Sequence, residues 1–197
     1  MSKTKQEWNA LKTIKTPKFR ASFAHVFEPH KFEDNDGPAK YSTAMLFPKS
    51  TDLKIMKVAA IAAAAEKWGE DKTKWPKNLR LPFRDGDEKT DLQGYEGHIF
   101  VSASSNTKPG LVDQKREPIL AEEDFYSGCY ARAELRAFAY DVSGNKGVSF
   151  ALLNLQKLAD GEAFSGKKKA EVAFNDDFEI DTEGLDVEGD SDSDMGF

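Results

Sequence analysis

The sequence predicts a mainly β fold: a small antiparallel barrel with one helix, followed by an acidic C-terminal tail. Several segments alternate apolar and polar residues, which is the pattern of strands with one buried face. The segment at about 51–68 is rich in alanine and has no such alternation, so it is predicted to be the helix. Helices do not alternate with strands along the chain, and this argues against a parallel α/β fold.

Two strands are predicted before the helix. The first covers 18–27, and its alternate positions are predicted to share one face: Phe19, Ala21, Phe23, His25 and Phe27. Residues 28–39 are rich in Asp, Asn, Gly and Pro and are predicted to form a turn region. The second strand covers 40–47 and ends at Pro48.

The predicted helix has recognisable start and stop signals. Ser50 or Thr51 is the expected N-cap, and Gly69 is expected to end the helix. Between Ile55 and Ala65 the helix is apolar on nearly every side. A helix of this kind is expected to be buried, either plugging one end of the barrel or covering a sheet.

The remaining strands are predicted after a long polar connection at 70–97. They cover 98–105, 117–124, 126–141 and 146–158, with turns at Pro109 and Gly110 and at 143–145. The chain is therefore divided into a flexible basic N-terminal arm (1–15), a barrel domain (16–170) and a disordered acidic tail (171–197).

Charge is distributed unevenly between the tail and the rest of the chain. Residues 176–197 hold ten of the 34 acidic residues and no Lys or Arg, so the remaining 24 acids face all 28 basic residues in residues 1–175. A basic body joined to an acidic tail is typical of proteins that bind nucleic acid. The N-terminus lacks the apolar stretch of a signal peptide, and no segment is long and apolar enough to predict a membrane helix. With one cysteine, the chain is expected to reside in a reducing cytoplasm.

The segment 130–140 is the strongest candidate for ligand binding. As a strand it would turn small apolar residues inward and aromatic and charged residues outward. The outward set is Tyr130, Arg132, Glu134, Arg136, Phe138 and Tyr140. Aromatic rings offer stacking platforms to unpaired bases, and guanidinium groups bind phosphates, so this row is typical of single-stranded nucleic-acid binding. The same residues fit equally a face that is buried by the helix or by a subunit partner.

A second basic and aromatic segment, 72–84, supports the nucleic-acid interpretation. It contains no acid, and it interleaves Trp75 and Phe83 with Lys72, Lys74, Lys77, Arg80 and Arg84. The alternative is a solvated loop in which Trp75 packs back onto the domain.

No catalytic, cofactor or metal site is expected. Asp85, Asp87 and Glu88 could hold Mg²⁺ in a metal-dependent nuclease, but their spacing equally fits a plain turn. The histidines at 25, 30 and 98 have no partners at metal-ligand spacing. Cys129 is predicted to be an inert core thiol.

Four segments resemble a phage family of OB-fold single-stranded DNA-binding proteins: "LPFRDGDE" (81–88), "YEGHIFVSASSNTKPGLVD" (95–113), "FYSGCYARAELRAFAYD" (125–141) and "NKGVSFALLNLQKLADGE" (145–162). The resemblance implies an OB-fold barrel with Tyr130, Arg132 and Phe138 on or beside the DNA groove. The usual OB barrel has its helix between the third and fourth strands, whereas only two strands precede residue 50 here. Either 16–27 is one long bent strand or the topology is a variant.

The expected function is therefore sequence-independent coating of single-stranded DNA in phage replication or recombination, without catalysis and with possible homo-oligomers on DNA. The acidic, aromatic-ended tail resembles that of replication proteins of lytic phages. It is expected to regulate DNA binding and to recruit a polymerase, helicase or nuclease through Asp190, Asp192, Asp194 and Phe197. The alternatives are the nuclease above and an acidic protein that mimics DNA.

Overall fold

The computed structural model describes residues 3–31, 37–142 and 144–164. Its helices are α1 (Lys5–Lys12) and α2 (Lys54–Trp68), with 3-10 turns η1 (Lys72–Lys74), η2 (Gly86–Glu88) and η3 (Glu122–Asp124). Its strands are β1 (Thr13–Lys15), β2 (Phe19–His30), β3 (Lys40–Pro48), β4 (Arg84–Asp85), β5 (His98–Ser105), β6 (Gly110–Val112), β7 (Tyr130–Val142) and β8 (Asn145–Ala159).

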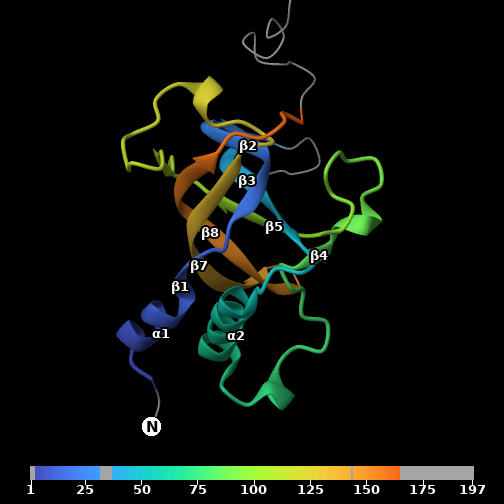
Figure 1. The fold of residues 1–197 in the computed structure, drawn as a ribbon. Coiled ribbons are helices and arrows are strands. Elements are labelled where there is room, and N and C mark those ends of the chain that lie inside the picture. Colours follow the sequence, from blue (N-terminus) through green and yellow to red (C-terminus); the bar gives the residue numbers. More distant parts are fainter. Residues whose placement is uncertain (1–2, 32–36, 143, 165–197) are drawn as a thin grey trace, which may run out of the picture. The chain divides into compact units, whose positions relative to one another are not determined.

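Five strands close into a barrel (Figure 1). Hydrogen bonds join them in the order β7, β2, β3, β5 and β8, and the β7–β8 pairing closes the ring. Within the ring only β5 and β8 run parallel to each other. This is the OB-fold arrangement, and the predicted fold class is confirmed.

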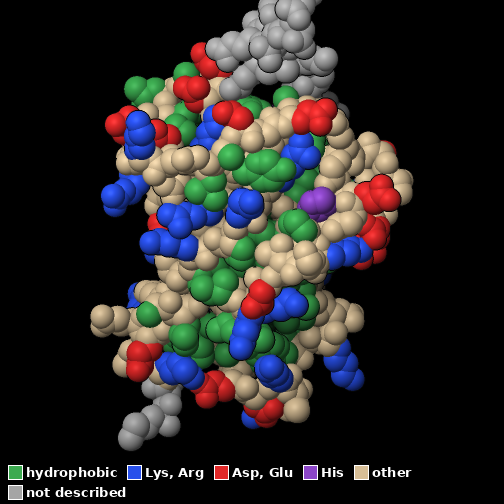
Figure 2. Space-filling model, in the orientation of Figure 1, with side chains coloured by type: hydrophobic (Ala, Val, Ile, Leu, Met, Phe, Trp, Pro, Cys, Tyr) green, Lys and Arg blue, Asp and Glu red, His purple; other side chains and the backbone are tan. Residues whose placement is uncertain are grey.

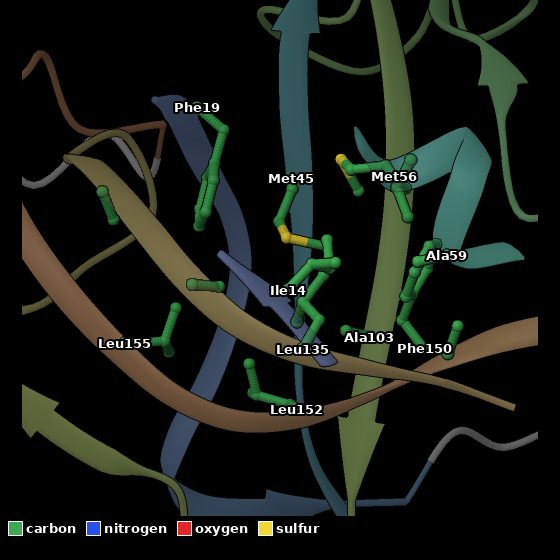
Figure 3. Packing of buried hydrophobic residues seen from close by; sticks show 14 of the residues in the cluster. Ile14, Phe19, Met45, Met56, Ala59, Ala103, Leu135, Phe150, Leu152 and Leu155 are labelled. Atoms are coloured by element: carbon green, nitrogen blue, oxygen red, sulfur yellow. The ribbon is translucent and has the colours of Figure 1, made fainter. Parts of the chain in front are cut away.

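Helix α2 lies at one end of the barrel (Figure 1). Met56, Ala59 and Ala63 project from it into the same buried core as the inward residues of the strands. Figure 3 shows this packing, with Ala59 of α2 beside Phe150 of β8. The plug predicted from the all-round apolar pattern is therefore confirmed, although one face of α2 stays exposed. Neither helix in the described part of the chain has the length and apolar content needed to span a bilayer.

The position of α2 in the chain is a variant of the usual OB barrel. β2 is one strand of 12 residues, and its pairing with β3 is interrupted by bulges. Only two barrel strands, β2 and β3, therefore precede the helix. Of the two possibilities raised by the sequence, the variant topology is the one observed, and the long first strand covers Phe19–His30 and not 16–27.

The N-terminal segment is more ordered than the flexible arm predicted for 1–15. The side chains and backbone groups of Thr4 and Glu7 form a capping box that starts α1. The Lys12 ammonium pairs with the Glu66 carboxylate of α2, and β1 then joins the edge of β7. The prediction considered only the polar composition of this segment and missed the caps and the tertiary partner.

The face predicted for the first strand is wrong at Phe23, although Phe27 does pack against the core. Phe19 and Ala21 are buried in the core, but a bulge between Ser22 and His25 adds residues to β2. Because side chains alternate with period two, the bulge changes which positions face inward. Phe23 is 45% exposed, with a backbone φ of 46°, and Val26 is buried in its place.

Two further details correct the sequence predictions. Segment 117–124 is no strand, since it makes one isolated bridge, Val112 to Pro118, and then the turn η3. The N-cap of α2 is Leu53 and not Ser50 or Thr51, while the Asp52 carboxylate accepts a hydrogen bond from the Lys54 backbone N–H. The buried state predicted for Cys129 is confirmed, and burial raises the pKa of its thiol.

Candidate nucleic-acid interface

The outer face of β7 carries the row of residues predicted from the sequence. Strict alternation holds: Ala131, Ala133, Leu135 and Ala137 are buried, whereas Arg132, Arg136 and Phe138 are exposed. Small residues of β8 lie opposite the outward side chains, with Ser149 beside Phe138 and Ala151 beside Arg136. Phe138 is consequently 41% exposed, and within the described residues its ring and the two guanidinium groups are open to a ligand.

Arg132 lies in a shallow groove of about 210 Å³ on this face. The groove is bordered by two further cations, Lys15 and Arg116, and by one carboxylate, Glu134, to which Asn154 Nδ2 donates. Arg132 Nε donates to Gln156 Oε1 at 2.7 Å, which holds the guanidinium group in one orientation. Three cations around one hollow can bind the phosphates of a single strand, and the oriented guanidinium group can pair with them.

Tyr130 lies at the start of β7 and is half-buried. The Lys18 ammonium and the Arg20 guanidinium group lie 5.5 and 5.9 Å from its ring centroid. Arg20 also donates to the carbonyl oxygens of Gly128 and Glu162. Tyr130 therefore already stacks with side chains of its own domain and offers less surface than Phe138.

The backbone of Arg80 is hydrogen-bonded to β8 near the β7–β8 hairpin. Its N–H donates to Lys146 O at 3.0 Å, and the Val148 N–H donates to Arg80 O at 2.9 Å. The next residue of β8, Gly147, lies against Tyr140: a side chain at Gly147 would meet the Tyr140 hydroxyl oxygen at 2.4 Å. The structure thus brings Arg80 and Tyr140 together at one end of the β7 row.

Trp75 and Arg84 of the 72–84 segment do not join this row. The Trp75 indole N–H donates to Gly69 O at 2.8 Å, and its ring packs against the core, so the alternative raised for Trp75 holds. Lys77 is exposed. Arg84 extends over a different outer face, where its guanidinium group lies 5.2 Å from the ring centroid of Phe100 in β5.

The second outer face of the barrel, over β2, β3 and β5, was missed by the sequence analysis. Its centre is covered by a small apolar cluster in which Tyr95 and Phe100 meet edge to face. Beside the cluster is a hollow of about 240 Å³ that Phe23 lines. Burial raises the pKa of Tyr95, whose hydroxyl donates to Ser22 Oγ at 3.3 Å. The sequence pattern did not predict that Phe23 is exposed, because the bulge exposes a residue that strand alternation places inside.

Farther along the same face is a smaller hollow of about 140 Å³ with basic and hydroxyl side chains. Lys31, Lys40, Ser42 and Ser104 line it. The Ser42 hydroxyl is buried and has no hydrogen-bond partner among the described residues. OB folds commonly bind oligonucleotides on the face of their second and third strands, which are β3 and β5 here. The signal in the sequence was a repeat of small polar residues at alternate strand positions.

The carboxylates considered as a metal site are held by a lysine. Lys49 Nζ lies 2.8 Å from Asp85 Oδ1 and 2.5 Å from Asp87 Oδ2, and this ammonium group lowers the pKa of both aspartates. Asp87 also accepts from the Gly97 N–H. An ammonium group therefore occupies the position between the two carboxylates where a cation would bind, and the described residues contain no cluster of three or more potential metal ligands.

The tail residues Asp190, Asp192, Asp194 and Phe197 lie outside the described part of the chain, as does the predicted disordered segment 171–197. Nothing in the structure bears on either prediction.

Comparison with known proteins gives consistent matches over most of the chain. A protein family described as Enterobacter phage Enc34, ssDNA-binding protein, matches residues 12–185. The protein p50 of Acyrthosiphon pisum secondary endosymbiont phage 1 is 36% identical over 176 residues, which are 85% of this chain and 94% of p50.

Solved structures match as well. The single-stranded DNA-binding protein from bacteriophage Enc34 in complex with ssDNA superposes with a TM-score of 0.66 at 29% identity, over 78% of this chain and 89% of that one. The single-stranded DNA-binding protein gp2.5 of bacteriophage T7 superposes with a TM-score of 0.53 over 80% and 97% of the two chains. At 13% identity the T7 protein is a likeness of fold alone.

Proposed function

Because the chain belongs to the family of the Enterobacter phage Enc34 single-stranded DNA-binding protein, we propose that it binds single-stranded DNA. It coats the strand without reading the sequence, in phage DNA replication or recombination. No catalytic step is part of this proposal.

The observation that carries the proposal is the open row on β7 of an OB barrel. Arg132, Arg136 and Phe138 project from one strand face, and Arg80 lies beside Tyr140 where that face ends. Successive bases stack on flat rings whatever their identity, and guanidinium groups neutralise phosphates between them. Neither contact depends on the base, which is what a coating protein requires.

We extend the proposal to the acidic C-terminal segment. Residues 176–197 carry ten acids and end in Phe197, so they imitate a single strand in charge and in having a flat ring. A tethered ligand has an effective concentration of roughly millimolar, so even a weak imitation competes with DNA. DNA would displace the segment and free it for a replication protein with a basic pocket.

Two alternative functions have less support. The nuclease needs Asp85 and Asp87 as metal ligands, and both are paired with Lys49. The DNA mimic needs an acidic body, whereas residues 1–175 hold 28 basic and 24 acidic residues.

The test is a titration of fluorescent oligo-dT with the full chain at several salt concentrations, with duplex DNA as the control. We expect tight binding to oligo-dT that weakens linearly in log–log coordinates with salt. Equal affinity for both DNAs, or none for oligo-dT, contradicts the proposal. Incubation of the labelled oligonucleotide with Mg²⁺ and the protein should leave it intact, and cleavage would favour the nuclease.

A further inference from the structure

Helix α2 has a second apolar face that the barrel does not use. One face packs into the core through Met56, Ala59 and neighbouring alanines. On the other side, Ile55, Val58 and Ile61 are 48, 45 and 42% exposed. Large exposed apolar side chains gathered in one place mark interaction surfaces more often than isolated ones do.

A groove of about 330 Å³ runs beside this face, between α2 and the segment that follows it. It is lined almost entirely by apolar side chains: Ala60, Ile61, Ala64, Trp75, Leu79, Leu81, Phe83 and Val148. Leu81 at its rim is 60% exposed. Figure 2 shows hydrophobic side chains gathered over the lower part of the molecule, where Figure 1 places α2, with Lys and Arg side chains among them.

The rim of this α2 groove is positively charged. Lys57 lines the groove, and the Lys72 ammonium lies 6.0 Å from the ring centroid of Trp75, which also lines it. In the described residues, neither of these two lysines forms an ion pair with a carboxylate. By contrast, Glu66 and Glu70 at the end of the helix are paired with Lys12 and Lys3. The charge next to the apolar floor is thus left for a partner.

This combination of shape and charge selects among the possible occupants. A second copy docking through the same face would bring lysine against lysine, which opposes association. A lipid surface suits a convex apolar face, whereas a groove with walls accepts side chains from a helix or strand. An acidic segment with apolar anchors satisfies both the floor and the rim.

We propose that the α2 groove is a docking site for an acidic, amphipathic segment of a partner protein. Its apolar side chains, spaced at i, i+3, i+4 and i+7, fill the groove beside Ile61 and Leu81, and its carboxylates pair with Lys57 and Lys72. The groove adjoins the end of the β7 row, because Arg80 lies between Leu79 and Leu81 and its carbonyl oxygen accepts from the Val148 N–H.

The experiment measures fluorescence anisotropy of a labelled 18-residue peptide of Leu and Glu in the i, i+3, i+4, i+7 pattern, titrated with the full chain. A peptide with Lys in place of every Glu is the matched probe. We expect the Glu peptide to bind about tenfold more tightly than the Lys peptide, with the difference shrinking as salt rises. Equal binding of the two peptides, or no binding, overturns the proposal.

Variants locate the site. Ile61→Lys, Leu81→Lys and Lys57→Glu should each weaken binding of the Glu peptide about fivefold or more. Leu120→Lys and Lys115→Glu are the controls, because both residues are exposed on another part of the domain and Leu120 is 87% exposed. If Ile61→Lys alters the thermal melt, Leu81→Lys carries the test, since Leu81 lies outside α2. Oligo-dT binding should be unchanged in Ile61→Lys and Leu120→Lys, which keeps this result independent of the proposed function.

Three other outcomes overturn the choice of occupant. Displacement of the probe by a free peptide of residues 176–197 would make the chain's own C-terminal segment the occupant. Concentration-dependent dimers in sedimentation velocity that Ile61→Lys abolishes would make it a second copy. Binding to phosphatidylglycerol vesicles that Ile61→Lys abolishes would make it a membrane.

Discussion

The two outer faces of the barrel are built from the same kind of alternating strand, but one is covered by the chain and the other is exposed. Over β2, β3 and β5 the outward residues include Leu46 and Phe100, and the connection before β5 covers them with Tyr95. Over β7 the outward residues are arginines and a phenylalanine, and the described chain leaves them open. The chemistry of the outward side chains decides whether a face is covered.

This difference in exposure predicts which residues affect folding stability and which affect ligand binding. Phe100 is 5% exposed and packs on Tyr95, so its surface is already buried by the fold. Phe138 is 41% exposed, and its remaining apolar surface is available only to something outside the described chain. Residues of the covered face should therefore affect folding, and residues of the open face should affect ligand binding.

The largest expected effect is on the covered face. Phe100→Ala should lower the free energy of unfolding by about 3–5 kcal/mol, because it leaves a cavity beneath Tyr95. Phe138→Ala, the matched change on the open face, should lower it by less than about 1 kcal/mol. Urea denaturation followed by tryptophan fluorescence measures both. Comparable losses in the two variants would mean that the β7 row is also structural.

The second-largest expected effect is the loss of base stacking on Phe138. Phe138→Ala should weaken oligo-dT binding by about 1–3 kcal/mol if a base stacks on the ring, whereas Phe23→Ala should leave it nearly unchanged. Phe23 is the proper comparison because it is a similarly exposed phenylalanine on the other face. The reverse result would move the DNA to the face of β3 and β5, where Ser42 and Lys40 line the neighbouring hollow.

These comparisons also show what could be predicted from the sequence. The sequence left open whether the outer side of β7 is exposed or buried, and the structure exposes Arg132, Arg136 and Phe138 while the alternating residues from Ala131 to Ala137 face inward. Phe23 was placed on the wrong face because a bulge has no signal in periodicity. Trp75 was grouped with the binding residues by composition, yet its indole N–H is bound to Gly69 O through folding of the connection. Local patterns predict strands and their faces, but long-range contacts decide which loop residues contribute to a binding surface.

The arginines should differ from the aromatic residues in kind. Arg132→Ala or Arg136→Ala should flatten the dependence of log affinity on log salt by roughly 0.7 for each lost phosphate contact. Phe138→Ala should leave that slope unchanged, because a stacking contact releases no counterion. Oligo-dT titrations at four salt concentrations give the slopes. If alanine at 132, 136 and 138 changes neither affinity nor slope, the open face of β7 is not the DNA site.

The smallest expected effect concerns competition for the open face by the C-terminal segment. Deleting residues 176–197 should tighten oligo-dT binding about two- to fivefold at low salt, because a weak tethered ligand at roughly millimolar effective concentration occupies the site part of the time. The gain should fade as salt screens the carboxylates, and the preference for single strands over duplex should relax. Deleting Phe197 alone should harm partner binding more than DNA binding.

An Arg132→Ala, Arg136→Ala double variant tests whether this competition takes place on β7, since a segment that competes there loses its partner cations in that variant. In that background the deletion should bring no gain, and a gain as large as in the parent chain would place the competition elsewhere. If the deletion never tightens DNA binding at low salt, the segment does not imitate DNA, and its charge serves only to keep the protein soluble.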